Sequence, residues 1–422
     1  MSMDLREREM TLGDRVMARL DALARYSAED GALTRLYLTP AHRDAAQAVM
    51  GWMQEAGLDT TLDAAGSVVG RLPGGEGPRL ILGSHIDTVV NGGRYDGPLG
   101  VIVAIEALAE LQRRGVALPF PVDVLAFGDE EGVRFPVTLT GSRALAGTLG
   151  PDWLAARDAE GISLGDALTA FGCDPAGLAG LARDPAEVGA YVEVHIEQGP
   201  VLEATDRPVG IVSGIAGATR ATIVVTGMAG HAGTVPMALR RDALAGAAEM
   251  VLAVEELAQE TDDLVATVGQ IEVRPGAVNV IAGTARFTID VRSTDDAVRN
   301  AAMEALQHRF EAIATRRGLS LAIDVGYRQP AATCAPQLRQ ALAAAVAAEG
   351  VEPIELPSGA GHDGLAMIAL CPIAMLFVRC RGGISHHPAE AITPADADMA
   401  TRVLIQFLEA YAGSSPAGPA KA

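Results

Sequence analysis

Histidines and carboxylates that could hold a divalent metal follow short apolar segments at several points of this sequence. His85 and Asp87 come directly after the apolar run 80–82, and Asp96 lies in the glycine-rich segment that follows. A strand end holds such side chains on rigid backbone, at the edge where α/β sheets carry out their chemistry. Imidazole and carboxylate groups are suitable ligands for a divalent metal. Taken alone, the stretch is equally compatible with a strand-end histidine and a turn aspartate.

Two adjacent glutamates, Glu130 and Glu131, follow the next apolar segment, 122–127. Adjacent carboxylates repel one another, so a solvated loop is the simpler interpretation of this pair alone. The alternative gives them different roles: one ligates a metal, and the other moves protons to and from a metal-bound water, with a pKa set by burial and by the cations. The location at a strand end beside the strand of His85 favours this second interpretation.

Six of the eight histidines lie in glycine-rich or acidic surroundings, a clustering that indicates a site. His195 lies near the end of the apolar segment 191–196, and His386 and His387 follow the apolar segment 373–378. A site for two metals needs about six or seven donor groups. Parallel strands that each supply one ligand at their ends would assemble such a site.

The order of helical and extended patterns predicts an α/β catalytic domain interrupted by a second domain. Strand, helix and strand patterns over 80–86, 101–114 and 122–127 form a βαβ unit, so we expect a mainly parallel sheet. Further along the chain, residues 208–226 alternate and are rich in Val, Ile and Thr, as in antiparallel strands. Strand patterns over 265–273 and 284–291 and helical patterns over 240–258 and 295–317 follow. These predict an inserted α+β domain with a four-stranded sheet and two helices.

The expected catalytic domain comprises residues 1–210 and 329–413, and the insert comprises residues 211–328. The first pattern resumes after the insert, so the catalytic domain is divided in sequence and joined in space. Residues 414–422 are rich in Ser, Pro and Ala and are expected to form a disordered tail.

The composition limits the kinds of partner that we expect. A net charge of −20 argues against nucleic acid and against an anionic membrane, although a local arginine still allows an anionic small substrate. No apolar run reaches the roughly 18 residues that span a bilayer, and Met1–Met17 lacks the apolar core of a signal peptide. The four cysteines form no CxxC pair, which fits free thiols and a cytoplasmic location.

Seven strings, in order between about residues 80 and 390, resemble the amidase/hydantoinase/carbamoylase branch of the dimetal aminoacylase and carboxypeptidase superfamily. This branch contains allantoate amidohydrolases, N-carbamoyl-L-amino acid hydrolases and β-ureidopropionases. Each string alone is weak, but the ordered set is specific. The strings are GSHIDT…GRYDGPLG, GDEEGVRF, HIEQGP, GMAGHAGTVPM, PGAVNVI…DVR, SGAGHD and GISHHPAE.

The resemblance implies a zinc-peptidase-like catalytic domain with a mainly parallel mixed sheet flanked by helices, and two divalent metal ions, Zn²⁺ or Mn²⁺, per subunit. The implied ligands are His85 and His195 for one metal, Glu131 and His386 for the other, and Asp96 as the bridge. His387 is the alternative to His386, which is preferred because the family pattern places the ligand directly after Ile-Ser.

The resemblance also implies the catalytic roles. Glu130 would be the general base and acid, and Asp87 would orient His85 through its other ring nitrogen. His231, in the insert, would reach the partner subunit's site and steady the developing oxyanion, which implies a homodimer formed through the inserted domain. Taken alone, His231 is more simply an ordinary loop histidine.

The residues implied for substrate binding lie in both domains. Arg292 and Asn279 would hold a substrate carboxylate, because a guanidinium fork binds a carboxylate in bidentate fashion. Taken alone, Arg292, close to Asp290, is more simply a salt-bridged arginine. Gln198 and His362 would line the pocket.

The implied reaction removes the terminal carbamoyl group of a small anionic ureido substrate, with release of ammonia and CO₂. Allantoate is the preferred substrate, and N-carbamoyl-L-amino acids and N-carbamoyl-β-alanine are the alternatives. A metallo-aminopeptidase or dipeptidase also fits the doubled glutamates. A metal-free small-molecule binder would have lost ligands, whereas all five are present in this sequence.

Overall fold

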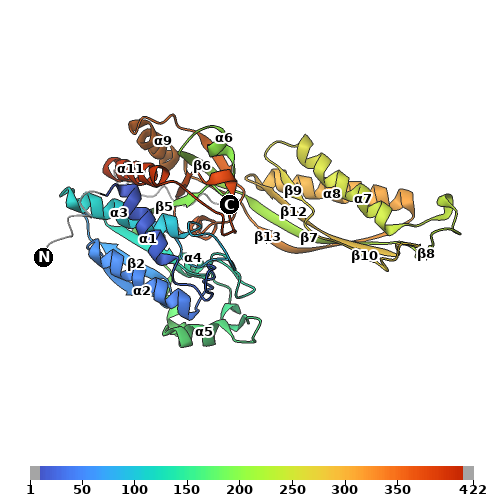
Figure 1. Ribbon diagram of the computed structural model, residues 1–422, viewed down its shortest axis with the longest axis horizontal. Helices are drawn as coiled ribbons and strands as arrows, with labels where there is room; N and C mark the ends of the chain where they lie inside the picture. Colours follow the sequence, from blue (N-terminus) through green and yellow to red (C-terminus); the bar gives the residue numbers. More distant parts are fainter. Residues whose placement is uncertain (1–9, 412–422) are drawn as a thin grey trace. The chain divides into compact units, whose positions relative to one another are not determined.

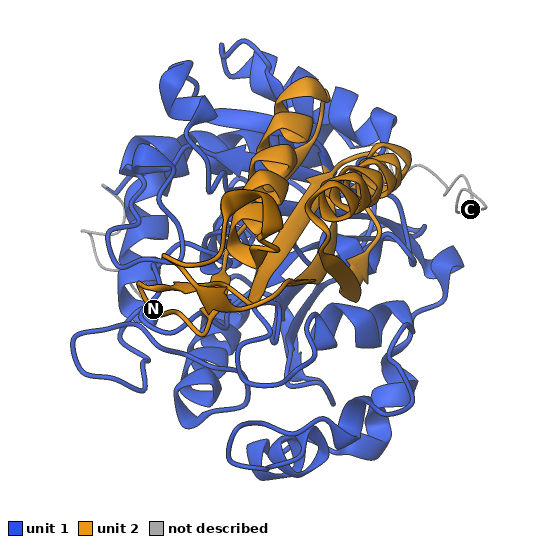
Figure 2. Ribbon diagram, turned by 90° about the vertical axis from the view of Figure 1, so that its right-hand side faces the viewer, with its two compact units in different colours: residues 1–214, 333–422 blue, residues 215–332 orange. Residues whose placement is uncertain are grey.

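The computed structural model describes residues 10–411 and divides the chain into two compact units, which Figure 2 colours separately. Unit 1 comprises Met1–Gly214 and Thr333–Ala422, and unit 2 comprises Ile215–Ala332. The tail expected over 414–422 lies outside the described residues. None of the described helices is long and apolar enough to span a membrane.

Unit 1 is built on a nine-stranded mixed sheet (Figure 1). Its strands are β1 (Asp59–Leu62), β2 (Val68–Leu72), β3 (Arg79–His85), β4 (Val122–Phe127), β5 (Val188–Ile196), β6 (Val209–Ile215), β14 (Ala332–Thr333), β15 (Glu355–Ser358) and β16 (Ile373–Val378). The order is β1-β2-β4-β3-β5-β16-β6-β14, with β15 also paired to β6. The pairs β4–β3, β3–β5 and β5–β16 are parallel, which confirms the predicted mainly parallel, mixed sheet.

Helices flank this sheet and bury its central strands. They are α1 (Leu12–Leu23), α2 (Pro40–Glu55), α3 (Pro98–Arg113), α4 (Thr140–Ala146), α5 (Leu164–Phe171), α6 (Val201–Ala204), α9 (Pro336–Ala348), α10 (Gly364–Met367) and α11 (Pro394–Ala410). Every residue of β4 and β16 is buried, as expected for parallel strands covered on both faces. Helices α1, α3, α9 and α11 share one hydrophobic core with β3, β4, β5 and β16.

Strand β6 crosses the domain boundary expected at residue 211. It runs to Ile215 and pairs in antiparallel register with β16, so Ile211–Gly214 belong to the sheet of unit 1. The alternating pattern of this region was correctly interpreted as antiparallel. The pattern does not distinguish a last strand of one sheet from a first strand of the next, because both alternate with period two.

Unit 2 contains an antiparallel sheet with two helices. Its elements are β7 (Gly217–Thr226), β8 (Gly230–His231), α7 (Ala243–Glu260), β9 (Val265–Thr267), β10 (Ile271–Arg274), β11 (Val280–Ile281), β12 (Thr284–Ser293), α8 (Asp296–Arg317) and β13 (Ser320–Gln329). Helices α7 and α8 pack against β7 and β12 over a single core. The sheet has five strands, not the predicted four, because the strand expected over 265–273 is divided into β9 and β10, which both pair with β12.

Candidate active site

The ends of three adjacent parallel strands bring the predicted catalytic-domain residues to one edge of the sheet. His85 is the last residue of β3, and His195 is the last but one of β5. Glu130 and Glu131 follow β4, in which Phe127 is paired with His85. Since β4, β3 and β5 are neighbours and parallel, their carboxyl ends share one edge, where ligands bind in open α/β sheets.

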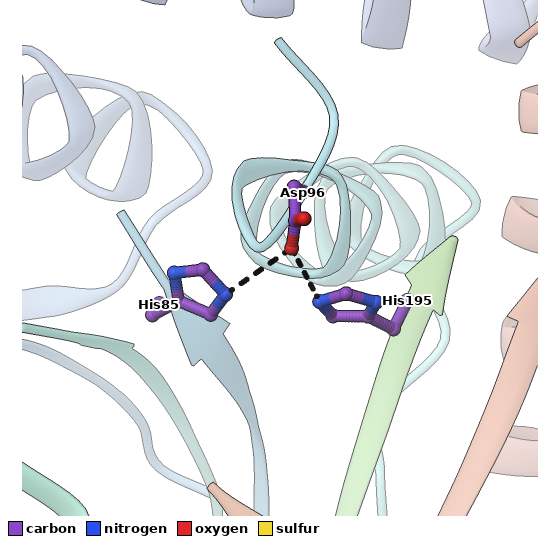
Figure 3. Close-up of side chains that lie close together, drawn as sticks. All are labelled: His85, Asp96 and His195. Carbon is purple, nitrogen blue, oxygen red and sulfur yellow. Dashed lines mark ion pairs between the residues drawn. The ribbon is translucent and has the colours of Figure 1, made fainter. Parts of the chain in front are cut away.

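The first group of candidate metal ligands consists of His85, His195 and Asp96 (Figure 3). The two rings project from their strands toward the Asp96 carboxylate, which enters from the segment before α3. Asp96 Oδ1 lies 3.6 Å from His85 Nε2 and 3.2 Å from His195 Nε2. All three side chains are buried.

Backbone carbonyls fix the orientation of both imidazoles. His85 Nδ1 donates to the carbonyl of Asp87 at 3.1 Å, and His195 Nδ1 donates to the carbonyl of Ile196 at 2.9 Å. A proton on Nδ1 leaves the Nε2 lone pair as the ligand atom, which is the usual arrangement for a histidine that binds a metal. Both lone pairs then face the same space beside Asp96.

Gly97 allows Asp96 to approach these rings. Its φ is +84°, a conformation that L side chains rarely adopt. A Cβ on Gly97 would lie 2.4–2.5 Å from atoms of the His85 ring. Any side chain at this position would therefore strain the backbone and displace a candidate ligand.

The second group of candidate ligands shares Asp96 with the first and adds Glu131 and His386. His386 Nε2 lies 3.4 Å from Asp96 Oδ2 and 3.4 Å from Glu131 Oε2. Its backbone has φ +55°, a strained conformation of a kind that often occurs at functional sites. His387 makes a local contact instead, since its Nδ1 accepts from the amide of Ala389 at 3.1 Å.

The donor set of these two groups fits a pair of divalent metals. Within residues 10–411, buried Glu131 Oε1 has no hydrogen-bond partner, and His195 Nε2 makes no hydrogen bond although Asp96 Oδ1 is near. Imidazole and carboxylate donors suit Zn²⁺ and Mn²⁺. Since Asp96 directs one oxygen to each group, it is in the position of a bridging ligand.

A third cluster, Glu193 with His195 and His362, is a weaker candidate for a metal. Glu193 Oε1 accepts from Ser84 Oγ at 2.8 Å, and Glu193 Oε2 accepts from Tyr191 Oη at 3.0 Å. Both oxygens therefore already have hydrogen-bond donors. This cluster is better explained as a polar support beneath His195.

Glu130 lies beside the first group without belonging to it. Its Oε2 is 3.8 Å from His85 Nε2, and its side chain is 11% exposed. Burial raises the pKa of Glu130 well above its usual value; His85 opposes the shift, and the neighbouring Glu131 carboxylate adds to it. A carboxylate with a raised pKa, held near a metal site, is suited to exchange protons near neutral pH.

The other two carboxylates of the site shift in opposite directions. Burial raises the pKa of Glu131 well above its usual value, and the charge of Asp96 adds to the shift. Burial also favours a raised pKa for Asp96, but the imidazoles of His195 and His85 beside its carboxylate hold that pKa well below the usual range. This direction favours the ionised form of Asp96, which binding of a divalent metal would require.

Asp87 connects the first group to the glutamate loop. Its Oδ1 lies 3.6 Å from His85 Nδ1, and the hydrogen bond of Nδ1 goes to the backbone carbonyl of Asp87 instead. The carboxylate also accepts from the amides of Glu130 and Glu131, each at 3.2 Å. Asp87 thus holds the His85 ring through its carbonyl and the backbone of the two glutamates through its carboxylate.

The two residues predicted to line a substrate pocket in this unit make specific contacts. Gln198 Nε2 donates to Asp96 Oδ2 at 2.7 Å and to Ser385 Oγ at 2.9 Å. His362 is 1% exposed, packs edge-to-face on His195, and has its Nε2 2.7 Å from Ser358 Oγ. Gln198 is thus bonded to the candidate bridging carboxylate, and His362 supports a candidate ligand.

His231, Asn279 and Arg292 lie in unit 2. The ribbon of β8 and β11 places the first two together, with the amide of Ala232 donating to the carbonyl of Asn279. The exposed His231 ring accepts from the amide of Gly233 at Nδ1, so its Nε2 carries the proton and can donate. Arg292, on β12, forms a bidentate pair with Asp290, at 2.8 and 3.0 Å.

Ser385 and Glu390 contact the candidate ligand Asp96 or its backbone, and the sequence alone assigned them no role. Ser385 Oγ donates to Asp96 Oδ2 at 2.6 Å, and Glu390 Oε1 accepts from the amides of Tyr95 and Asp96. The only sequence signal was their place in the string GISHHPAE. Their partners lie almost three hundred residues away, so no local pattern shows the contact.

Comparison with known proteins places this arrangement among metal-dependent hydrolases. Residues 81–410 match the peptidase family M20/M25/M40. An N-carbamoyl-L-amino acid amidohydrolase of Geobacillus stearothermophilus is 44% identical, over 94% of this chain and 97% of that protein. Allantoate deiminase of Arabidopsis thaliana is 43% identical, over 94% of this chain and 82% of that protein. An amidase of the hydantoinase/carbamoylase family from Burkholderia multivorans superposes with a TM-score of 0.89 at 32% identity, over 95% and 98% of the two chains.

Proposed function

This chain belongs to the peptidase family M20/M25/M40, as a hydrolase of carbon–nitrogen bonds other than peptide bonds, and we propose that it removes the terminal carbamoyl group of a small ureido acid. Allantoate is the substrate that we favour, and the products are ammonia, CO₂ and the remaining amine. The observation that carries the proposal is the pair of donor groups that share Asp96, with Glu130 beside them. Zn²⁺ or Mn²⁺ is the proposed metal in both positions.

The two metals, when bound, would supply Lewis acidity and lower the pKa of a water molecule. Glu130 accepts the proton of that water, because burial gives its carboxylate the basicity that the step requires. The oxygen of that water bonds to the carbamoyl carbon, and Glu130 returns the proton to the terminal nitrogen, which leaves as ammonia. The carbamate that remains on the other nitrogen then loses CO₂ and gives the amine. Asp87 accepts from the backbone amide of Glu130 and so holds the backbone from which the base extends.

Identity alone does not choose among the ureido acids, because two relatives with different activities are almost equally similar to this chain. One is an allantoate deiminase at 43% identity, and the other is an N-carbamoyl-L-amino acid amidohydrolase at 44%. Allantoate is placed first because the strings GDEEGVRFPVTLTGS and NGGRYDGPLG most resemble bacterial allantoate amidohydrolases. N-Carbamoyl-L-amino acids are the second candidate, and they differ in lacking the second ureido group.

A substrate panel tests this proposal. We expect ammonia release from allantoate with a kcat/KM at least about tenfold above that for N-carbamoyl-L-amino acids and N-carbamoyl-β-alanine, since a polar group left unpaired costs more than about 1 kcal/mol. Ammonia is measured by a coupled assay on protein loaded with Zn²⁺ or Mn²⁺. The same preparation treated with a chelator is the control. A higher rate on N-carbamoyl-L-amino acids would reverse the order, and turnover of none of these substrates would refute the ureido reaction.

We also propose that two copies of the chain pair through unit 2 and that His231 of each copy serves the other copy's site. The Nε2–H of His231 is a donor suited to a developing oxyanion. An exposed two-stranded ribbon that carries both this donor and Asn279 is difficult to explain as a structural element of a lone subunit. Arg292 is proposed to exchange its pairing with Asp290 for a substrate carboxylate.

A mixing experiment distinguishes sharing of His231 between subunits from its use within one subunit. Glu130→Gln and His231→Ala proteins are each expected to be nearly inactive. After mixing and exchange of subunits, about half of the dimers are mixed, and each mixed dimer has one site with both residues intact. About a quarter of the wild-type activity should therefore return. No recovery, despite subunit exchange shown by mass spectrometry, would contradict sharing.

A further inference from the structure

Glu390 joins the two chain segments that carry Asp96 and His386. Its Oε1 accepts from the amide of Tyr95 at 2.8 Å and from the amide of Asp96 at 3.1 Å. Its Oε2 lies 3.3 Å from the hydroxyl of Ser385, the residue before His386. A single carboxylate therefore contacts the backbone of one candidate ligand and the neighbour of another.

Protein stability alone does not explain the contacts of Glu390 with these two segments. Glu390 is 5% exposed, and none of the ion pairs within residues 10–411 includes it. Burying a carboxylate costs free energy, which two charge-assisted bonds from backbone amides only partly offset. A buried carboxylate at this position is better explained by the groups that it holds in place.

The loop of His386 makes hydrogen bonds within itself and to the segment that contains Gln198 and Glu203. The amide of Arg381 donates to the carbonyl of Ala391 at 2.8 Å, and the amide of Glu390 donates to the carbonyl of His387 at 3.0 Å. The amide of Gly382 donates to Glu203 Oε2 at 2.7 Å, and Gln198 Nε2 donates to both Ser385 Oγ and Asp96 Oδ2. Glu390 is the one of these side chains that contacts the backbone of the Asp96 segment, so it sets the distance between the two segments together with Ser385 and Gln198.

Gly93 gives independent support for this close approach. A Cβ on Gly93 would lie 2.1 Å from Cδ of Glu390 and 2.2–2.4 Å from its carboxylate oxygens. The φ angle of Gly93 is not positive, so its backbone conformation does not require glycine. The missing side chain at this position is explained by the space that the Glu390 carboxylate occupies.

We propose that Glu390 is a positioning residue that sets the spacing of Asp96 and His386 and thereby the affinity of the second metal position. It acts through the amides of Tyr95 and Asp96 and through Ser385, and it touches neither substrate nor metal. This inference rests on the proposed dimetal site. It predicts that the position formed by Asp96, Glu131 and His386 weakens when Glu390 is removed, while the position of His85 and His195 is retained.

The test is a titration of the metal-free protein with Zn²⁺ by equilibrium dialysis. Wild-type protein should bind two equivalents. Glu390→Ala should keep the first and bind the second about 10–100-fold more weakly, as for other residues that orient metal ligands. Glu390→Gln should stay within about threefold of wild type, because its amide oxygen can accept from the same two amides.

Gly93→Ala provides a second variant that leaves the Glu390 side chain in the sequence. It should weaken the second equivalent about as much as Glu390→Ala does, because its methyl group displaces the carboxylate. The double variant should bind no more weakly than Glu390→Ala alone, since the group that collides with the methyl is then absent. Gly92→Ala is the matched control, because its Cβ would meet Val89 at 3.0 Å and no atom of Glu390.

The possible failures can be told apart. Two equivalents with wild-type affinity in Glu390→Ala, or additive losses in the double variant, would overturn the positioning role. Fewer than two equivalents in wild-type protein would instead overturn the proposed dimetal site. Thermal unfolding of the metal-free variants checks folding, and Gly93→Ala keeps the test decisive if Glu390→Ala does not fold.

Discussion

Glu130→Gln is expected to lower kcat by about three orders of magnitude, within the 10²–10⁴ range typical of a general base and acid, and to leave metal binding intact. Glutamine has nearly the same shape but cannot accept a proton. Glu130 belongs to neither group of candidate ligands that share Asp96, and its Oε2 lies 3.8 Å from Nε2 of His85. The measurements are steady-state kinetics and metal content of the same preparation.

The Michaelis constant should change little in Glu130→Gln. A proton transfer occurs in the transition state, so losing it lowers kcat and kcat/KM together. A large rise in KM with kcat preserved would mean that the carboxylate binds substrate and does not transfer protons. That result would remove the proposed role of Glu130.

Glu131→Gln is the matched control, because it changes the adjacent residue in the same loop. In the wild-type protein, Oε2 of Glu131 lies 3.4 Å from His386 Nε2, and its Oε1 is buried without a hydrogen-bond partner among the described residues. This variant should lose affinity for one metal and regain activity at high metal concentration. Loss of metal in Glu130→Gln, or loss of activity without loss of metal in Glu131→Gln, would exchange the two roles.

The candidate site residues that the sequence pattern itself indicated lie at or directly after the ends of parallel strands. His85 and His195 lie at the ends of the neighbouring parallel strands β3 and β5. Glu130 and Glu131 follow the end of β4, which is parallel to β3 on its other side. An apolar segment followed by a polar residue is a local signal, and the parallel sheet converts it into proximity. The proximity of these side chains could be predicted because strand register leaves little freedom at the carboxyl edge.

The parts that could not be predicted depend on loop conformation. Gln198, Ser385 and Glu390 meet around Asp96 across gaps of 102, 289 and 294 residues. Two of the loops involved contain a non-glycine residue with positive φ, Gln198 and His386. No pattern of polar and apolar residues specifies such a conformation, so the same residues were compatible with a solvated loop.

In unit 2 the sequence predicted most helices and strands, but it did not predict the interruption of one strand. Helices α7 and α8 and strand β12 were expected within three residues of their observed ends. The strand expected over 265–273 is interrupted around Gly269, which lies between β9 and β10. Glycine weakens a strand interior, but whether a strand breaks depends on its partner, here β12. The roles of His231 and Arg292 came from family resemblance alone.

Asp96→Asn is expected to weaken both metal positions, whereas His386→Ala should weaken only one. Asp96 Oδ1 faces His85 and His195, and Oδ2 faces His386 and Glu131, so a single side chain contributes to both groups. An amide keeps the shape but supplies one neutral oxygen, so each position loses affinity. We expect each loss to be about 100-fold or more, because changes outside the ligand shell alone cost 10–100-fold.

The measurement is thermal unfolding with and without Zn²⁺, together with metal content. A ligand that binds only the folded state stabilises it by about 2.7 kcal/mol at 100 times its dissociation constant, so wild-type protein should gain a large increase in Tm and Asp96→Asn almost none. Asp123→Asn is the matched control: Asp123 is a fully buried aspartate on β4 that pairs with Arg79 and Arg183. That variant should unfold at a lower temperature but keep the full gain from Zn²⁺. If Asp96→Asn kept one tight equivalent, Asp96 would serve a single metal, and the bridge between the two groups would be refuted.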